Sequence, residues 1–239
     1  MNSYGPRIIT DGLVLCLDAA DKNSYPGTGT TWYDLSGKNH NATLINTPTY
    51  YPNYNGEFYF TGSSSENASV SYTSNLAPTS QITFESFAHI DANQLSKNTN
   101  MRLLSKTEAG GYQLGINEGS FIPAGYIGVL AYIGGGYRNA KIQYSSLSDT
   151  YHLYSGTFDG RYLRFYVDGV NVNTYDHGST STISYAASNA FIIAAEAGGG
   201  STAAGQYLSG FISITRVYNR ALSSSEILQN YNATKGRFK

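Results

Sequence analysis

The stretch "YHLYSGTFDGRYLRFYVDGVNVNTYD", residues 151–176, decides the fold class of this chain. It contains runs of alternating apolar and polar residues, separated by one Asp-Gly pair and followed by a second. In the middle run Leu163, Phe165 and Val167 share one face, as in a strand whose inner face packs on a core. Asp-Gly pairs between such runs indicate tight hairpin turns, because glycine readily adopts positive φ. This stretch therefore predicts three consecutive antiparallel strands.

Similar runs recur along the chain, bounded by Gly, Pro, Asn, Asp and Ser. They predict strands over residues 12–19, 56–62, 80–90, 101–106, 111–116, 124–134, 189–197 and 208–219. One helix is predicted near the C-terminus, where Ser223 and Glu226 have the spacing of a capping box. Its apolar stripe, Ile227, Leu228 and Tyr231, is expected to pack against the sheets. Many short strands with one helix predict an all-β sandwich of two antiparallel sheets.

The composition excludes several classes of protein. The chain has 239 residues, a net charge of −1 and only 13% charged residues. Nucleic-acid binding is not expected, because it requires clustered Lys and Arg. No apolar run approaches the ~20 residues of a membrane span, and the first residues lack a signal peptide's apolar region. We therefore expect synthesis in a cytoplasm and no membrane insertion. The lone Cys16 allows no internal disulfide.

The length allows a single domain. We expect that domain over residues 12–239, preceded by an N-terminal extension, residues 1–11, that is a candidate anchor to a partner. Proline and glycine in this extension favour an extended backbone.

Six segments occur in order along residues 10–238, and their combination is informative. They are "GLVLCLDAADKNSYPGTGTTWYDLSG", "FYFTGSSSENASV", "ITFESF", "LLSK", "YHLYSGTFDGRYLRFYVDGV" and "GFISITRVYNRALSSSEI". Together they resemble the laminin-G-like domains of the concanavalin A-like lectin/glucanase superfamily. The opening "LDAADKNSYPGTGTTWYDLSG" and the closing "YNRALSSSEILQNYNATKGRF" are similar to those of bacteriophage virion proteins, such as tail fibres and capsid decorations. The resemblance implies a jelly roll that binds ligands on a concave sheet or at its rim loops.

The chain departs from this family's pattern in three places. Phe87 stands near a position where the family commonly has Trp, and Tyr151 replaces the Trp that often opens its strand. Ser213 and Ile214 stand where acidic residues are often found. The aromatic replacements preserve apolar bulk, whereas the missing acids weaken any metal site carried over from the family.

The superfamily includes glycoside hydrolases, which need two carboxyl groups roughly 5–5.5 Å or 6.5–9.5 Å apart. Acids two positions apart on a strand would point the same way. None of the 16 acidic residues is two positions from another, and the closest pair is Asp18 and Asp21. The four histidines show no catalytic or metal-ligand spacing. We therefore expect a non-catalytic protein, with a glycoside hydrolase as the less favoured alternative.

Calcium is the cofactor that the resemblance implies, and it prefers hard oxygen ligands. The candidate ligands lie in "LDAADKN" and "DLSGKN", and they are Asp18, Asp21, Asn23, Asp34 and Asn39. In the alternative interpretation these residues only form turns, because Asp and Asn side chains bond to nearby backbone.

The chain contains 22 tyrosines, whose rings stack on the apolar faces of sugars. Two segments interpreted as loops supply candidate glycan contacts. These contacts are Tyr50, Tyr51, Tyr54, Tyr137, Arg138 and Asn139. In the alternative interpretation these tyrosines face a neighbouring subunit or a virion shell.

Two hypotheses of function follow. In the first, the chain is a bacteriophage virion surface protein, located in a capsid decoration or fibre, that binds host or environmental glycans. In the second, it is a structural capsid or tail accessory protein that acts through contacts with other virion proteins alone. A homo-oligomer is compatible with both.

Overall fold

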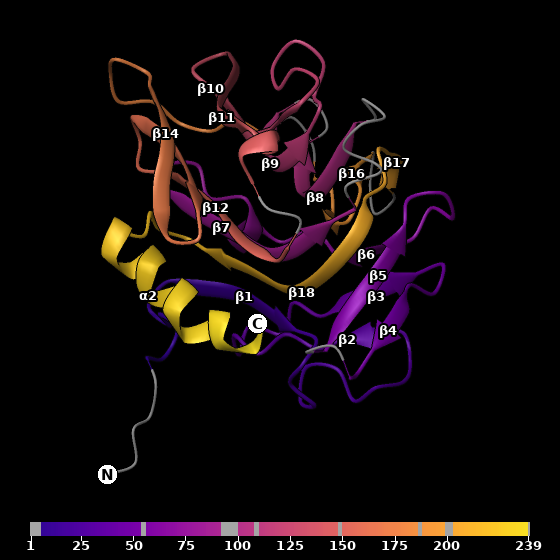
Figure 1. The fold of residues 1–239 in the computed structure, drawn as a ribbon. Helices are drawn as coiled ribbons and strands as arrows, with labels where there is room; N and C mark the ends of the chain where they lie inside the picture. The colour runs from indigo at the N-terminus through magenta and orange to yellow at the C-terminus, as the bar shows by residue number, and fades with distance from the viewer. Residues whose placement is uncertain are drawn as a thin grey trace.

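The computed structural model describes residues 6–53, 56–91, 100–107, 110–147, 150–185, 188–198 and 203–238. In these ranges the chain forms two large antiparallel sheets that face each other, with one α-helix on the outside (Figure 1). The predicted sandwich with a C-terminal helix is confirmed. Within the same ranges no helix is both long and apolar enough to span a membrane.

Sheet A has β7 (Ile82–Ile90) and β18 (Ser209–Tyr218) at its centre. Its described strands follow the order β14 (Val170–Asp176), β13 (Tyr162–Val167), β12 (His152–Phe158), β7, β18, β5 (Glu57–Thr61) and β4 (Thr49–Tyr51). β1 (Leu13–Asp18) pairs with the part of β18 that β5 does not reach. Segments from both ends of the chain therefore meet at β18.

Sheet B faces sheet A across the core. Its described strands follow the order β11 (Gly136–Gln143), β10 (Tyr126–Ile133), β9 (Gly111–Ile116), β8 (Met101–Thr107), β15 (Phe191–Ile193), β6 (Asn67–Val70), β3 (Ala42–Ile45) and β2 (Thr31–Trp32). A short hairpin of β16 (Glu196–Ala197) and β17 (Ala203–Gly205) lies beside β8. Short 3-10 helices are η1 (Ser74–Leu76), η2 (Tyr144–Ser146) and η3 (Lys235–Arg237).

The core fills the space between the sheets with alternate residues of their strands. Phe58 and Phe60 of β5 and Phe84 of β7 enter it from sheet A, and Val129 of β10 enters it from sheet B. The Trp32 ring lies 4.9 Å from that of Phe58, with an edge-to-face angle of 61°. Burying one such large apolar side chain contributes about 1.5–3 kcal/mol, so this core holds the sheets together.

The two Asp-Gly pairs form the turns that the sequence predicts. β12 pairs with β13, and β13 pairs with β14. Asp168 and Gly169 have φ values of 53° and 84°, which are typical of tight hairpin turns. The Asp159 carboxylate accepts hydrogen bonds from the backbone N–H groups of Arg161 and Tyr162, at 3.0 and 2.8 Å. Asp159 therefore stabilises its own turn.

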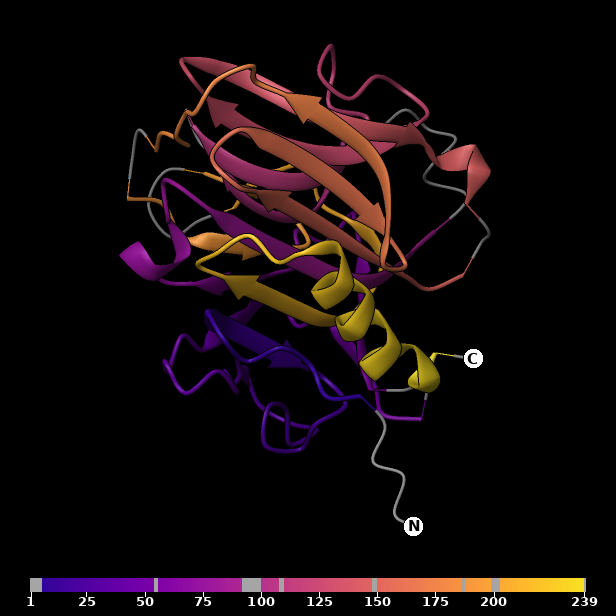
Figure 2. The ribbon, with the colours of Figure 1, turned by 90° about the vertical axis from the view of Figure 1, so that its left-hand side faces the viewer.

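The helix α2 (Ser224–Thr234) lies on the outer face of sheet A (Figure 2). Its predicted capping box is confirmed, because the Glu226 N–H donates to the Ser223 hydroxyl and the Ser223 N–H donates to the Glu226 carboxylate. Ile227 is buried as predicted, whereas Leu228 is 43% exposed. Leu228 is therefore less buried than predicted, because each residue advances about 100° around a helix, and it packs at the edge of the sheet beside Gly169 in the turn between β13 and β14.

A buried ion pair lies beneath α2. The Arg216 Nε atom lies 3.2 Å from a carboxylate oxygen of Glu85, and both side chains are almost fully buried. Asn230 of α2 donates to the same carboxylate at 3.1 Å and to the Tyr218 hydroxyl at 3.0 Å. Burial raises the pKa of Glu85, and the charge of Arg216 opposes that shift. Because a buried charge without its partners is costly, these contacts fix α2 on the sheet.

The segment over residues 1–11 is docked onto the domain where the structure describes it. The Ile9 N–H donates to Asn230 at 2.8 Å, and the Tyr218 hydroxyl donates to the Ile9 carbonyl oxygen at 3.1 Å. The Ile9 side chain also packs against the apolar cluster beneath α2. Ile9 is therefore part of the folded domain.

Candidate functional site

The outer face of sheet A carries aromatic side chains where polar residues are usual. Phe58 and Phe60 of β5 point into the core, so Tyr59 between them points outward. Phe211 of β18 and His89 of β7 are likewise half-buried between buried neighbours. Three adjacent strands thus each present one ring on the same face.

These rings continue to a fourth residue, Tyr151, which directly precedes β12. We call Tyr59, Phe211, His89 and Tyr151 the aromatic row. The strand register pairs Phe211 with Tyr59 on one side and with His89 on the other. Neighbouring ring centroids along the row lie 4.7, 5.9 and 5.4 Å apart. These distances are typical of interacting aromatic pairs, so the row forms a continuous half-buried surface.

Two acidic residues flank the aromatic row. Glu57 lies two residues before Tyr59, and Asp91 lies two residues after His89. β5 and β7 are both antiparallel to β18, so they run in the same direction. The two acids therefore lie on opposite sides of the row, each about 7 Å along its strand from it.

Hydrogen bonds join the acids to the hydroxyl groups of the row. Glu57 accepts from the Tyr151 hydroxyl, and Asp91 accepts from the hydroxyls of Tyr59 at 3.0 Å and Ser209 at 2.7 Å. Burial raises the pKa of Glu57, and its hydrogen bond with Tyr151 opposes that shift. Burial also raises the pKa of both tyrosines. The two phenols therefore remain protonated at neutral pH.

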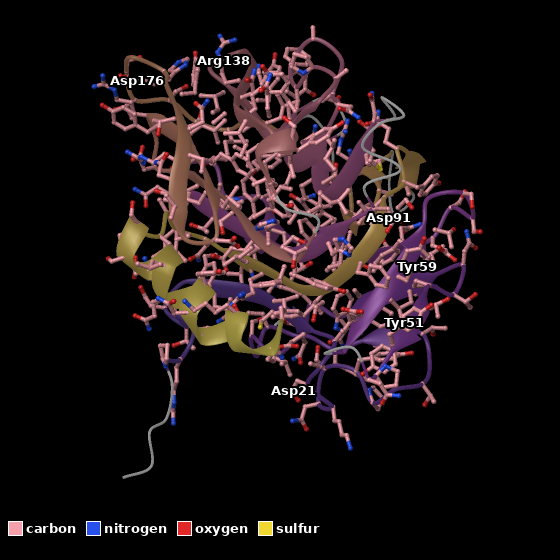
Figure 3. The ribbon with its side chains drawn as sticks, viewed as in Figure 1. Asp21, Tyr51, Tyr59, Asp91, Arg138 and Asp176 are labelled. Carbon is pink, nitrogen blue, oxygen red and sulfur yellow. The ribbon has the colours of Figure 1, made fainter. Side chains whose placement is uncertain are left out.

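Further aromatic residues border the row. The Tyr51 ring lies 5.9 Å from that of Phe211 and extends the surface along β4. Phe238, which follows η3, stacks on Phe87 of β7 at 4.0 Å. Tyr231 of α2 packs into the same cluster, as predicted for the helix. In Figure 3 Tyr51, which extends the row, lies on the same side of the molecule as Tyr59 and the flanking Asp91.

The predicted contacts near residue 50 divide between the core and this surface. Residues 49–51 form β4, whereas the sequence was interpreted there as a loop. The Tyr50 ring lies 5.4 Å from Phe58, and its hydroxyl donates to the Ala19 carbonyl oxygen at 3.0 Å, so Tyr50 belongs to the core. Tyr51 points outward to the aromatic row. Tyr54 lies outside the described residues.

The other predicted contacts lie in β11, at the edge of sheet B, and not in a loop. The Tyr137 ring lies 5.0 Å from that of Tyr132, and Asn139 accepts a hydrogen bond from Lys141 at 2.8 Å. Figure 3 shows Arg138 at the opposite end of the molecule from Tyr51. The structure therefore does not bring the two predicted groups of contacts together.

The predicted calcium ligands form turns and loop contacts. Asp34 accepts four hydrogen bonds from backbone and side-chain donors, and Asp21 accepts two from Asn23. Asp18 accepts from the guanidinium group of Arg237 at 3.0 Å. Asn39 occupies a turn with φ of 59°. Among the described residues no three His, Cys, Asp or Glu side chains gather as a metal site. The carboxylates of Asp18, Asp21 and Asp34 thus accept hydrogen bonds from neighbouring groups, as in the alternative interpretation, and calcium binding by these five residues stays a prediction.

The matching family agrees with this fold. A sequence model described as the concanavalin A-like lectin/glucanases superfamily, of laminin-G type, matches residues 61–228. The chain belongs to this superfamily. The matched region includes three of the four members of the aromatic row. A search of curated protein sequences gave no significant match.

Solved structures with a similar fold include binding domains of bacterial toxins. The ligand-binding domain of botulinum neurotoxin serotype D, solved with N-acetylneuraminic acid, has a TM-score of 0.69 and 16% identity, over 95% of this chain and 52% of that one. The binding domain of botulinum neurotoxin DC, solved with rat synaptotagmin II, has a TM-score of 0.68 and 12% identity, over 94% of this chain and 52% of that one. The binding domain of Paraclostridial Mosquitocidal Protein 1 has a TM-score of 0.69 and 12% identity, over 94% of this chain and 52% of that one. At these identities the likeness shows the fold alone, and this chain spans about half the length of each domain.

Reasoning from the sequence missed all four members of the aromatic row and predicted only Tyr51 beside it. Tyr59, His89 and Phe211 occupy outward positions of strands, as in "FYF" at residues 58–60, and Tyr151 directly precedes β12. Aromatic residues on both faces of one strand are the signal that would have marked them. That signal identifies single positions such as Tyr59, but it does not show which strands are neighbours.

Proposed function

We propose that this protein is a non-catalytic carbohydrate-binding protein and that it binds a glycan on the aromatic row. The observation that carries the proposal is the row itself, with four half-buried rings side by side on a sheet face. A contiguous apolar surface of this kind on a folded domain is typical of a binding site.

The chemistry of the row is complementary to a sugar. A pyranose ring has a face of C–H groups, which stack on aromatic rings, and an edge of hydroxyl groups, which need hydrogen-bond partners. The row supplies the rings, and Glu57 and Asp91 supply acceptors beside them. Because Tyr59 and Tyr151 are held by these acids, the surface is ordered before a ligand binds, which reduces the entropy cost of binding.

The placement of the two acids supports binding without hydrolysis. Glu57 and Asp91 are four residue steps apart along the strand direction and two strands apart across the sheet. A glycoside hydrolase needs one carboxyl group to protonate the leaving oxygen and the other to attack the sugar or activate water. Each acid is also bonded to a phenol, so its expected role is to accept hydrogen bonds.

We further propose that the protein is exposed on a bacteriophage virion, beside other virion structural proteins. The support is the resemblance of its opening and closing segments to domains of such particles. The toxin domains with a similar fold act in receptor binding, one of them solved with a sugar acid, which fits a role in recognition. Under the alternative of a structural accessory protein, the row would contact a neighbouring protein.

The experiment is a glycan array, followed by titration of the best ligand into the wild type and Phe211→Leu. Leucine keeps apolar bulk in β18 but removes the ring face. Loss of one stacked ring costs about 1–3 kcal/mol in comparable base-stacking sites, so we expect about 10-fold or weaker binding.

Tyr137→Leu is the matched control, because it removes a half-buried ring from β11, far from the row. We expect its affinity to stay within about twofold of the wild type, since a variation outside the site costs little. If no glycan binds, or if Phe211→Leu binds as well as the wild type, the proposal is wrong.

A further inference from the structure

We infer that the ligand of the aromatic row is an uncharged glycan, and that Glu57 and Asp91 select against acidic sugars and sulfated glycans. This inference rests on the proposed function and specifies the chemical class of the ligand.

The first observation concerns charge. Among the described residues, the Arg side chains that form ion pairs contact acids other than Glu57 and Asp91, and no Lys or Arg pairs with these two. His89 is the basic side chain within the row itself, and it lowers the pKa of Glu57 only as a minor influence. The row is therefore flanked by two carboxylates that no described Lys or Arg neutralises.

The second observation concerns the individual oxygen atoms. Tyr151 donates to Oε2 of Glu57, while Tyr59 and Ser209 both donate to Oδ2 of Asp91. The other oxygens, Oε1 of Glu57 and Oδ1 of Asp91, accept no hydrogen bond within the described part of the chain. Asp91 is half-buried, whereas Glu57 is only 3% exposed. Asp91 therefore offers a ligand the accessible acceptor oxygen, and Glu57 acts mainly through its charge beneath the row.

An acceptor of this kind discriminates by chemistry. A neutral sugar brings hydroxyl groups, and a hydroxyl donates to a carboxylate in a charge-assisted hydrogen bond. A sugar carboxylate or sulfate brings only acceptor atoms at its charged group, so it makes no such bond and meets a like charge. Like-charge contact and an unpaired acceptor both count against the wrong ligand, which is how binding sites exclude close analogues.

The test compares a neutral glycan with its own acidic derivative. Suitable pairs are dextran with dextran sulfate, cellulose with carboxymethylcellulose, and lactose with 3′-sialyllactose. Affinities are measured by titration in about 20 mM and about 500 mM salt, because screening weakens charge effects as the Debye length falls. We expect the neutral member to bind at least about tenfold more tightly at low salt, and the difference to shrink at high salt.

Charge-removing variants assign that selectivity to the two acids. In Asp91→Asn and Glu57→Gln the ratio of neutral to acidic affinity should fall to about threefold or less, because one like charge is gone. Asp176→Asn, which removes a charge at the end of β14 on the opposite side of the molecule from Asp91, should leave the ratio unchanged (Figure 3).

The outcomes separate the two proposals. Tight binding of an acidic glycan that Phe211→Leu abolishes would overturn this inference and leave the proposed function intact. A selectivity that is the same in Asp91→Asn, Glu57→Gln and the wild type would also overturn it. If neither member of any pair binds, or if Phe211→Leu changes nothing, the proposed function fails and this inference fails with it.

Discussion

Replacing Glu85 by leucine should destabilise the protein far more than replacing the whole buried ion pair. In Glu85→Leu the Arg216 guanidinium remains beneath α2 with no carboxylate beside it, and both side chains have an exposed fraction of 1% or less. Asn230 and Ser155 also lose an acceptor, at 3.1 and 3.3 Å. Removing one partner of a buried pair costs about 3–5 kcal/mol.

The double variant Glu85→Leu/Arg216→Met removes both charges and refills the space with apolar atoms. Such replacements are often neutral, so the remaining cost is that of the lost acceptor of Asn230 and, through its longer bond, of Ser155, together about 1 kcal/mol. Asn230 also keeps its bond to the Tyr218 hydroxyl at 3.0 Å, which limits this loss. The single variant should therefore be less stable than the double variant by roughly 2–4 kcal/mol.

The assay is urea unfolding of the wild type, Glu85→Leu and the double variant, with thermal unfolding as a second measure. For a domain of this size each kcal/mol shifts the midpoint by about 2–4 °C, so Glu85→Leu should melt roughly 6–20 °C below the wild type. If Glu85→Leu is as stable as the double variant, the pair does not hold α2 in the way described. Arg216→Met alone provides the reciprocal control, because it leaves the Glu85 carboxylate buried without a cation.

Three further predictions concern local chemistry. Hydrogen bonds from the Arg220 guanidinium group and from the helix cap lower the pKa of Glu226 to about 2. The wild type should therefore be more stable than Glu226→Gln by about 1 kcal/mol at pH 7, and this difference should disappear as the pH falls from 4.5 to about 2. Urea unfolding measures the difference, and a difference at pH 2.5 equal to that at pH 7 would contradict the prediction. Burial raises the pKa of the Cys16 thiol to about 12. A thiol reagent at pH 8 should therefore label the unfolded protein at once, and the native protein only as the fold around Cys16 opens. Rapid labelling of the native protein would refute this. Gly169→Ala and Gly135→Ala both place a methyl group at positive φ, but only the first meets Leu228, 2.8 Å from its Cδ1 atom and 2.9 Å from its Cα atom. The first should therefore lower the melting temperature further, and equal losses would show that the contact with α2 is unimportant.

Local signals in the sequence predicted much of the fold. The Asp-Gly turns around β13 and the capping box of α2 depend on residues within four positions of one another, so their chemistry can be read directly from the sequence. The inward positions of β5 and β7 were also predictable, because apolar residues alternate with others along each strand.

Two errors show where local reasoning fails. β11 is an edge strand with few buried residues, so it has no apolar alternation, and the glycines before it led to its interpretation as a loop. Tyr50 and Tyr51 are neighbours, but a strand turns one into the core and the other outward. In a segment rich in Pro and Asn that register cannot be read without the pairing strand.

The candidate site could not be predicted because it depends on strand pairing. Tyr59 and Phe211 are 152 positions apart in the sequence and become neighbours only when β5 pairs with β18. His89 and Tyr151 join them through two further pairings of β7. No local pattern determines which strands become neighbours, so the row appears only in the folded protein.

The central claim is that a glycan lies on the outer face of sheet A, and a crystal structure of the protein with its best neutral oligosaccharide tests it most directly. We expect a sugar ring stacked on Phe211, with its carbons about 3.5–4 Å from the phenyl ring and hydroxyl groups donating to Asp91 or Glu57. A sugar bound beside Tyr137 on β11, or anywhere else away from these rings, would contradict the account.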